Sequence, residues 1–173
     1  MKIWLNMFDQ EMPKFSVVGQ FIKDISFENL VSRELPQAGQ EPVVRVDADV
    51  EYRPFTGIEK MSQNAYETVL KVTATMTLGE RNLFIAEVEY VGIVQFEKEY
   101  QESQIEPVVY IEVPYYLFFE ARNLIASLAT QAGFGPVFLR PVDFTQIYMS
   151  KSKHAQKMAE QMAGAGQGGP INQ

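Results

Sequence analysis

The sequence predicts an α+β fold, in which a four-stranded antiparallel, meander-like sheet is followed by two C-terminal helices. Two observations predict it. Apolar and polar residues alternate with a period of two through four stretches of the first two-thirds of the chain, as in strands that bury one face. In the last third, apolar residues recur at helical spacing instead. With 173 residues, the chain is long enough for one domain with its own core.

The first predicted strand runs from 15 to 28, and its odd-numbered positions form the apolar face: Phe15, Val17, Gly19, Phe21, Ile25 and Phe27. A loop containing Pro36, Gly39 and Pro42 follows. The second strand has an apolar face made of Val44, Val46, Ala48, Val50 and Tyr52. Its other face carries only charged residues: Arg45, Asp47, Asp49 and Glu51.

The third and fourth predicted strands, 66–78 and 84–90, form a hairpin. The turn between them contains Gly79 and Asn82, which tolerate positive φ angles. A loop over 53–64, with Pro54 and Gly57, separates the second and third strands.

The first predicted helix begins near Pro114, which suits a first helical turn, and ends at Gly133 as its C-cap. Two prolines, Pro136 and Pro141, exclude a helix between Phe134 and Pro141. Asp143 then caps a second helix, with Gln146 three residues further on as in a capping box. The apolar positions of this second helix are Phe144, Ile147, Tyr148, Ala155, Met158 and Met162.

We expect an N-terminal extension over 1–12 with no defined order, a single domain over 13–163, and a disordered Gly- and Gln-rich tail over 164–173. Polar residues interrupt the apolar ones within 1–12, so no signal peptide is predicted. No window approaches the roughly 18 apolar residues of a membrane-spanning helix. These features predict a cytoplasmic protein that does not insert directly into a membrane.

The residue inventory argues against catalysis and against a nucleic-acid partner. The net charge is −7, whereas phosphate binding needs concentrated Lys and Arg. There is no cysteine and only one histidine, His154, which excludes thiol catalysts and Cys/His zinc sites. The acid pairs Asp47 with Asp49 and Glu87 with Glu89 lie on polar strand faces, where solvation explains them. The sequence therefore predicts a protein that is not an enzyme, with no metal and no cofactor.

Apolar residues crowd the proline-broken loop, namely Phe134, Val137, Phe138 and Leu139. They either pack beneath the loop as a satellite of the core or line an exposed groove. Methionines in the last helix and long strands with few edge-blocking prolines favour a groove for varied, extended partners.

Four segments in order resemble SecB, a family of bacterial protein-export chaperones. They are 23–28 (KDISFE), 66–73 (YETVLKVT) with 78–80 (LGE), 117–122 (LFFEAR) and 138–144 (FLRPVDF). The resemblance covers roughly 15 to 149. It implies a four-stranded antiparallel sheet with two helices and a homotetramer built as a dimer of dimers. It also implies ATP-independent holding of unfolded preproteins in the cytosol and their delivery to the motor SecA.

The resemblance assigns roles to individual residues. Those matching the SecA-contacting surface are Asp24, Glu28, Leu78 and Glu80, and Asp24 and Glu28 share one polar strand face. The expected client groove lies between the second helix with its preceding loop and the sheet with its first crossover. One wall would contain Phe134, Phe138, Leu139, Phe144, Ile147 and Tyr148, with Leu30 and Leu35 contributed by the crossover.

Parts of the chain depart from the family pattern. The segment 1–12 has no recognisable counterpart, and the glutamate-rich stretch 97–111 differs from the usual run before the long helix. Two alternatives stay open. One is a SecB-like chaperone of a toxin–antitoxin system. The other is an apolar small-molecule carrier, for which we would expect a closed pocket within the monomer.

Overall fold

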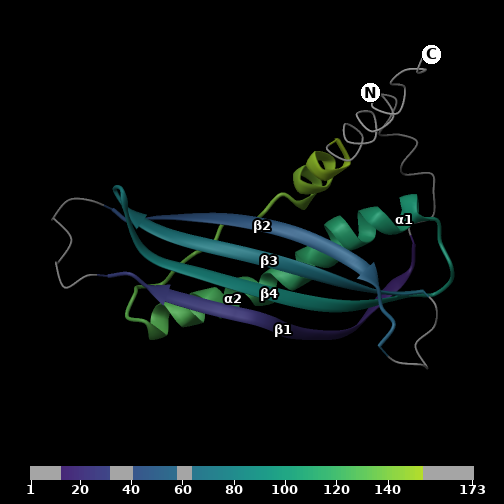
Figure 1. The fold of residues 1–173 in the computed structure, drawn as a ribbon, viewed down its shortest axis with the longest axis horizontal. Coiled ribbons are helices and arrows are strands. Elements are labelled where there is room, and N and C mark those ends of the chain that lie inside the picture. Colours follow the sequence, from purple (N-terminus) through teal and green to yellow (C-terminus); the bar gives the residue numbers. More distant parts are fainter. Residues whose placement is uncertain (1–12, 32–40, 58–63, 154–173) are drawn as a thin grey trace, which may run out of the picture.

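The structure, a computed structural model, describes residues 13–31, 41–57 and 64–153. Its four strands are β1 (Phe15–Asn29), β2 (Val43–Pro54), β3 (Ala65–Leu78) and β4 (Arg81–Phe96). They form one antiparallel sheet in the order β1-β4-β3-β2 (Figure 1). The predicted fold class is confirmed. The predicted extension 1–12, the tail 164–173 and the helix positions Ala155, Met158 and Met162 lie outside the described residues.

The meander holds for β2, β3 and β4 but not for β1. β1 pairs with β4 rather than with β2, so the chain crosses from one edge of the sheet to the other between them. Alternation along a strand specifies which face is buried and carries no information on which strand lies alongside. β3 and β4 form the predicted hairpin, where Gly79 has φ 60° at the first position of a two-residue turn.

β1 does not keep one alternation along its whole length. Its pairing with β4 shifts register between Val17 and Gly19 and again between Ile22 and Asp24. Each β-bulge adds one residue and reverses the faces that follow. Phe21, predicted on the apolar face, therefore lies opposite Val91 on the face away from the helices, with Gly19. The second shift restores the predicted face for Ile25 and Phe27.

One nearly continuous helical run follows the sheet. It comprises α1 (Glu102–Pro107), a π-helical turn (Val108–Glu112) and α2 (Val113–Gln131). The start of α2 at Val113–Pro114 and its end before Gly133, with φ 92°, agree with the sequence prediction. α1 and the π turn were not predicted. Pro107 and the β-branched pair that follows it weaken the helical signal there, and a π turn accommodates such an interruption.

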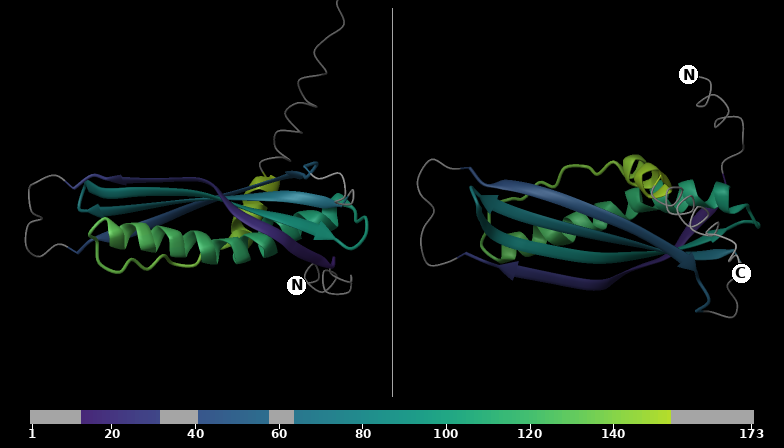
Figure 2. Two further views of the ribbon diagram at one scale, coloured as in Figure 1. Left: turned by 90° about the horizontal axis from the view of Figure 1, so that it is seen from below. Right: turned by 45° about the horizontal axis from the view of Figure 1, so that its top comes forward.

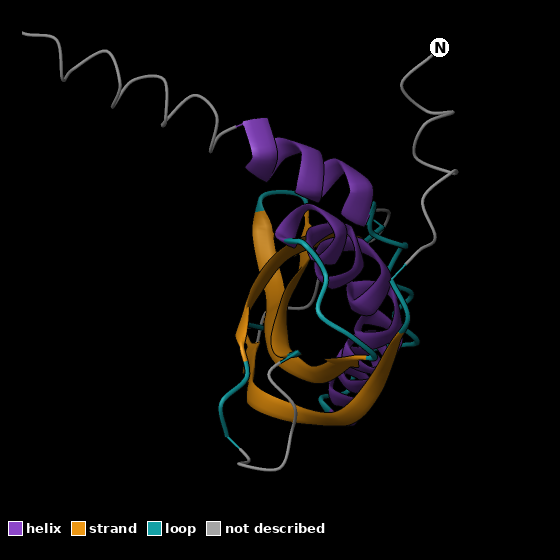
Figure 3. Ribbon diagram, turned by 90° about the vertical axis from the view of Figure 1, so that its right-hand side faces the viewer, coloured by secondary structure: helices purple, strands orange, loops and turns teal. Residues whose placement is uncertain are grey.

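The core lies between α2 and one face of the sheet (Figures 2 and 3). Leu117 of α2 lies directly over Gly92 of β4. Around this contact the side chains of β3, β4 and α2 that face each other are almost fully buried, including Leu70, Val88, Val94, Ala121 and Ile125. We call the face with α2 the helix face of the sheet and the opposite face its outer face.

The segment 134–143, which we call the strap, leaves the end of α2 without regular secondary structure. It leads to a helix that covers 144–153. Asp143 caps this helix as predicted, because its Oδ1 accepts a hydrogen bond from the Gln146 backbone N–H at 3.0 Å. The strap and the helix bring the end of the described chain beside β2 (Figure 1).

A candidate binding groove along the edge strand

A hollow of about 410 Å³ lies between the edge strand β2 and the strap; we call it the first hollow. Its β2 wall is apolar at Val44, Val46 and Ala48, with Asp47 beside them. The opposite wall consists of Arg140, Pro141, Val142, Asp143, Gln146 and Ile147. The sequence prediction of a groove between the sheet and the second helix with its preceding loop corresponds to this place.

Both walls of the first hollow present backbone without a strand partner. β2 pairs only with β3, so its other edge has no partner strand among the described residues. Within the strap, no backbone-to-backbone hydrogen bond involves 135–142 in the part of the chain that the structure describes. Unpaired N–H and C=O groups along an extended segment can pair with an added extended chain.

Polar and aromatic contacts close one end of the first hollow. Lys151 Nζ lies 2.7 Å from Asp49 Oδ1 of β2. The Tyr148 hydroxyl donates to Glu106 Oε2 at 3.1 Å, and the Tyr148 ring stacks on Tyr110 with centroids 5.6 Å apart. Burial and the Glu106 carboxylate raise the pKa of Tyr148, which keeps this donor protonated. The helix over 144–153 is thereby held against β2 and the π turn.

A second hollow of about 400 Å³ lies further along β2. Its lining residues are Tyr52, Arg53, Pro54, Tyr66, Glu102 and Ile105. The Tyr52 hydroxyl donates to Glu102 Oε1 at 3.1 Å, and the Tyr52 ring meets Tyr110 edge-on at 5.2 Å. A row of three tyrosines, Tyr52, Tyr110 and Tyr148, thus stands between the two hollows.

The predicted wall residues divide into lining and supporting side chains. Ile147 lines the first hollow, and Tyr148 closes its end. Leu139 and Phe144 are buried in the core, where Phe144 contacts the rings of Tyr115 and Phe118. Phe134 packs on Phe27 and Phe84. These buried residues position the strap and do not face the first hollow.

Two predicted groove residues lie away from the first hollow, and a third is not described. Phe138 is 86% exposed and lines a separate depression against α2, with Ala126 and Thr130. Leu30 is exposed and bonds through its N–H to the carbonyl of Leu83, on the β4 side of the sheet and away from β2. Leu35 lies outside the described residues.

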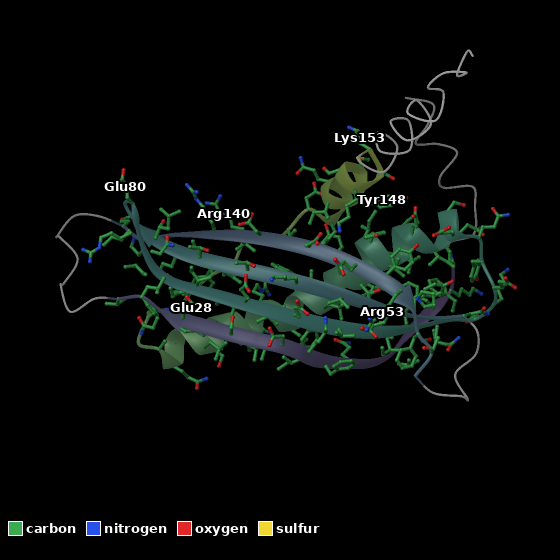
Figure 4. All side chains as sticks on the ribbon, viewed as in Figure 1. Glu28, Arg53, Glu80, Arg140, Tyr148 and Lys153 are labelled. Atoms are coloured by element: carbon green, nitrogen blue, oxygen red, sulfur yellow. The ribbon has the colours of Figure 1, made fainter. Side chains whose placement is uncertain are left out.

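The acidic residues predicted to contact a basic partner lie on the outer face and at one end of the sheet. Asp24 stands opposite Glu89, and Glu28 opposite Ile85, so both acids share the outer face as predicted. Glu80 is exposed in the β3–β4 turn, and Figure 4 places it toward the same end of the sheet as Glu28. Leu78 is only 8% exposed and presents little surface.

Basic residues neutralise part of the outer face. Lys23 Nζ lies 2.7 Å from Glu89 Oε2, and this hydrogen bond lowers the pKa of Glu89. Lys71 Nζ lies 3.4 Å from Glu87 Oε2. Arg53 pairs with Glu67 near the other end of the sheet (Figure 4). The middle of the outer face therefore carries internal ion pairs, whereas Glu28 and Glu80 lie toward the turn.

The sequence prediction missed the β2 wall and the strap residues from Arg140 to Val142. Val44, Val46 and Ala48 had been recognised as the apolar face of a strand. Alternation alone could not reveal that β2 is an edge strand, where such a face can extend into a groove.

Among the described residues, no group of three or more His, Cys, Asp or Glu side chains is arranged to hold a metal ion. None of the helices within the described ranges is both long and apolar enough to span a membrane.

Comparisons of the sequence with known proteins find similarity to protein-export chaperones. A family model for preprotein translocase subunit SecB matches residues 9–155. The protein-export protein SecB of Hyphomonas neptunium is 34% identical over 148 residues, covering 86% of this chain and 84% of that protein. SecB of Zymomonas mobilis is 32% identical over 162 residues, covering 94% of each chain.

Among solved structures, the fold is similar to a SecB-like chaperone of Mycobacterium tuberculosis in complex with a ChAD peptide from an antitoxin. The TM-score is 0.59 at 9% sequence identity, covering 74% of this chain and 90% of that one. At this identity the likeness concerns the fold.

Proposed function

Because the chain belongs to the SecB family, we propose that it is an ATP-independent chaperone that holds unfolded preproteins ready for export and passes them to SecA. It performs no catalytic step and acts in the cytoplasm. The single observation that carries the proposal is the first hollow, in which apolar side chains lie between the unpaired edge of β2 and a strap whose backbone makes no backbone-to-backbone hydrogen bond over 135–142 in the described chain.

This hollow suits a partner defined by its unfolded state. Val44, Val46 and Ile147 offer apolar contact without a deep side-chain pocket of one shape. The free edge of β2 offers hydrogen bonds to peptide groups, which every client carries. Binding that depends on backbone and on nonspecific apolar burial serves many sequences at one site.

The proposed surface for SecA consists of the exposed acids toward the turn end of the outer face, Glu28 and Glu80, together with Asp24. Exposed carboxylates attract a basic partner and speed its encounter. Leu78, which the family resemblance also points to, would act beneath this surface by supporting the turn, since it is buried.

The homotetramer is supported by two apolar surfaces. Val18, Ile22 and Ile25 are exposed on β1, whose free edge has no partner among the described residues. Tyr115, Tyr116 and Phe119 are exposed on α2. A long apolar edge strand left open promotes aggregation, so pairing between copies is the stable arrangement. A dimer of dimers needs two kinds of contact between copies, and the surfaces on β1 and α2 can provide one each.

A pull-down tests the proposed function. The purified protein is immobilised and incubated with SecA, with a urea-unfolded preprotein, or with both, in the absence of ATP. We expect the unfolded preprotein and SecA to be retained separately and together, and the same preprotein to be lost once folded. Equal retention of folded and unfolded preprotein would refute selective holding, and failure to retain SecA would refute delivery.

The two alternatives have less support. The antitoxin-peptide complex shares only the fold at 9% identity, whereas the export proteins are 32–34% identical over most of the chain. A small-molecule carrier needs an enclosed pocket, and the two hollows along β2 open to the surface.

A further inference from the structure

The N-terminal segment 1–12, MKIWLNMFDQEM, contains a dense run of apolar side chains. Five large apolar residues fall within six positions: Ile3, Trp4, Leu5, Met7 and Phe8. The family match begins at residue 9, so this apolar run lies outside it. A short run of aromatic and aliphatic side chains is also what an unfolded client offers to a chaperone. The composition raises the question of where this run binds.

The residues that directly follow the segment, Pro13 and Lys14, are held against the body of the protein. Pro13 is buried, and the Lys14 N–H donates to the Tyr100 hydroxyl at 3.2 Å. The Lys14 carbonyl accepts from the Glu97 N–H at 3.1 Å. In Figure 1 the start of β1, the end of β2 and α1 lie at the same end of the sheet. The segment therefore leaves the body at the end that contains the second hollow.

A short series of aromatic contacts joins that starting point to the second hollow. The Tyr100 ring lies 5.8 Å from Phe96, and the Phe96 ring lies 5.7 Å from Tyr66, which lines the hollow. Residues 9–12, which link the apolar run to Pro13, span about 15 Å when extended, which exceeds these two ring separations taken together. The nearer end of the run 3–8 can therefore reach the hollow.

The second hollow matches the segment in size, polarity and charge. Its volume of about 400 Å³ lies within the range of about 300–1,000 Å³ found for ligand pockets. Tyr52, Tyr66 and Ile105 provide apolar surface. Arg53 lines its rim and, although it pairs with Glu67, keeps most of its side chain exposed, so that it can also attract the acids Asp9 and Glu11 between the apolar run and Pro13.

We propose that the apolar run 3–8 docks in the second hollow of its own chain and competes there with clients whose bound chain continues along β2 from the first hollow. The segment acts as an internal pseudo-client. It shields the aromatic surface of Tyr52 and Tyr66 until a client with more apolar contacts replaces it. Only the competition with clients rests on the proposed chaperone function; the docking itself does not.

Trp4 is the only tryptophan of the chain and reports on docking without any label or client. In the full chain, we expect Trp4 emission to be shifted to the blue and its acrylamide quenching to be several-fold weaker than in a free peptide of residues 1–12. Leu5→Ser with Phe8→Ser should restore quenching like that of the peptide. Asn6→Ser, a matched change at a polar position of the same segment, should leave the emission unchanged.

A substitution in the hollow identifies the docking place. Pro54→Glu adds a charge at the exposed rim, and circular dichroism checks that the fold is kept. We expect this variant to expose Trp4 as the segment variants do. Trp4 that is as accessible in the full chain as in the peptide overturns the proposal. So does Trp4 that stays protected in the folded Pro54→Glu protein, because the segment then docks elsewhere.

A tryptophan-free, fluorescein-labelled peptide from an unfolded preprotein tests the competition. If the segment occupies the hollow about 90% of the time, deletion of residues 1–8 should tighten peptide binding about tenfold. Unchanged affinity contradicts competition. If neither protein binds the peptide, the proposed chaperone function fails, whereas the Trp4 measurements still decide whether the segment docks.

Discussion

Gly92 lies where the sheet and the long helix approach most closely. A Cβ atom built at this position would lie 2.9 Å from Leu117 Cδ2, which is closer than carbon atoms pack. Any side chain at 92 must therefore displace Leu117 from the centre of the core. Because Gly92 has no Cβ, Leu117 of α2 can pack directly on β4 at this position.

Gly92→Ala should consequently destabilise the fold by about 1–3 kcal/mol, the usual cost of overpacking a core. Gly135→Ala is the matched control, because a Cβ there meets no atom within 4 Å and its φ angle is not in the left-handed region. Urea unfolding followed by circular dichroism measures both. Equal midpoints for the two variants would show that Leu117 adjusts without cost.

Reversal of the single charge at Glu80 tests whether this residue belongs to the proposed SecA surface. Glu80→Lys should weaken SecA binding several-fold, most at low salt, because it replaces an attractive charge with a repulsive one. Client binding should be unchanged, since Glu80 lies in the β3–β4 turn and the first hollow does not include it.

Glu99→Lys makes the same change in net charge beyond the opposite end of β4 and serves as its control. Titration calorimetry at two salt concentrations compares the variants. If both weaken SecA binding alike, the overall charge is responsible and Glu80 is not part of a specific surface.

Single residues with local roles were predictable from the sequence. Gly79 in the turn, Gly133 at the end of α2 and Asp143 at the cap of the last helix each act within a few residues of themselves. The burial of Leu78 and the exposure of Phe138 were not predictable in the same way. They depend on which distant elements pack beside them.

At the scale of elements, the proposed client site depends on the position of β2 at the edge of the sheet. The four strands were found from their alternation, but the β1–β4 pairing joins segments that lie far apart in the sequence. The first bulge of β1 falls at the apolar doublet Val17-Val18 and the second at Lys23, directly after the doublet Phe21-Ile22, so the apolar pattern marks neither change of face. Order and register therefore had to come from the structure.

In the strap, too, the sequence did not reveal which side chains face the core and which face solvent. Its alternation puts Val137 and Leu139 into the core and Phe138 outside, on the side of α2. The sequence prediction placed Phe134, Phe138 and Leu139 of this loop together on one wall. A hollow does lie between the strap and β2, but Phe134, Leu139 and Phe144 support its wall from beneath and do not line it.

Val46→Asp should reduce client affinity by on the order of tenfold or more, because it places a charge on the apolar β2 wall that a client would cover. Val43→Asp is the matched control on the same strand. Val43 pairs opposite Thr77 on the outer face and does not line the hollow. Fluorescence anisotropy with a labelled unfolded segment compares them. Equal losses would place the client elsewhere than along this wall.

At the scale of the whole molecule, the exposed apolar edge of β1 predicts how copies assemble. Ile22→Lys should reduce the mass measured by light scattering from four times the 19.7 kDa chain mass toward smaller species, since the charge opposes close pairing at this edge. Val43→Lys, at an exposed valine of β2, should leave the mass unchanged. A wild-type protein that is a monomer at micromolar concentration would contradict the proposed tetramer.

The most direct test of the account is whether the protein keeps an unfolded preprotein from aggregating without ATP. Light scattering follows a preprotein diluted from urea in the presence of stoichiometric tetramer. We predict that the wild type and Val43→Asp suppress the signal and that Val46→Asp suppresses it far less. A wild-type protein that leaves aggregation unchanged, or a Val46→Asp variant as effective as the wild type, would contradict a client groove along β2.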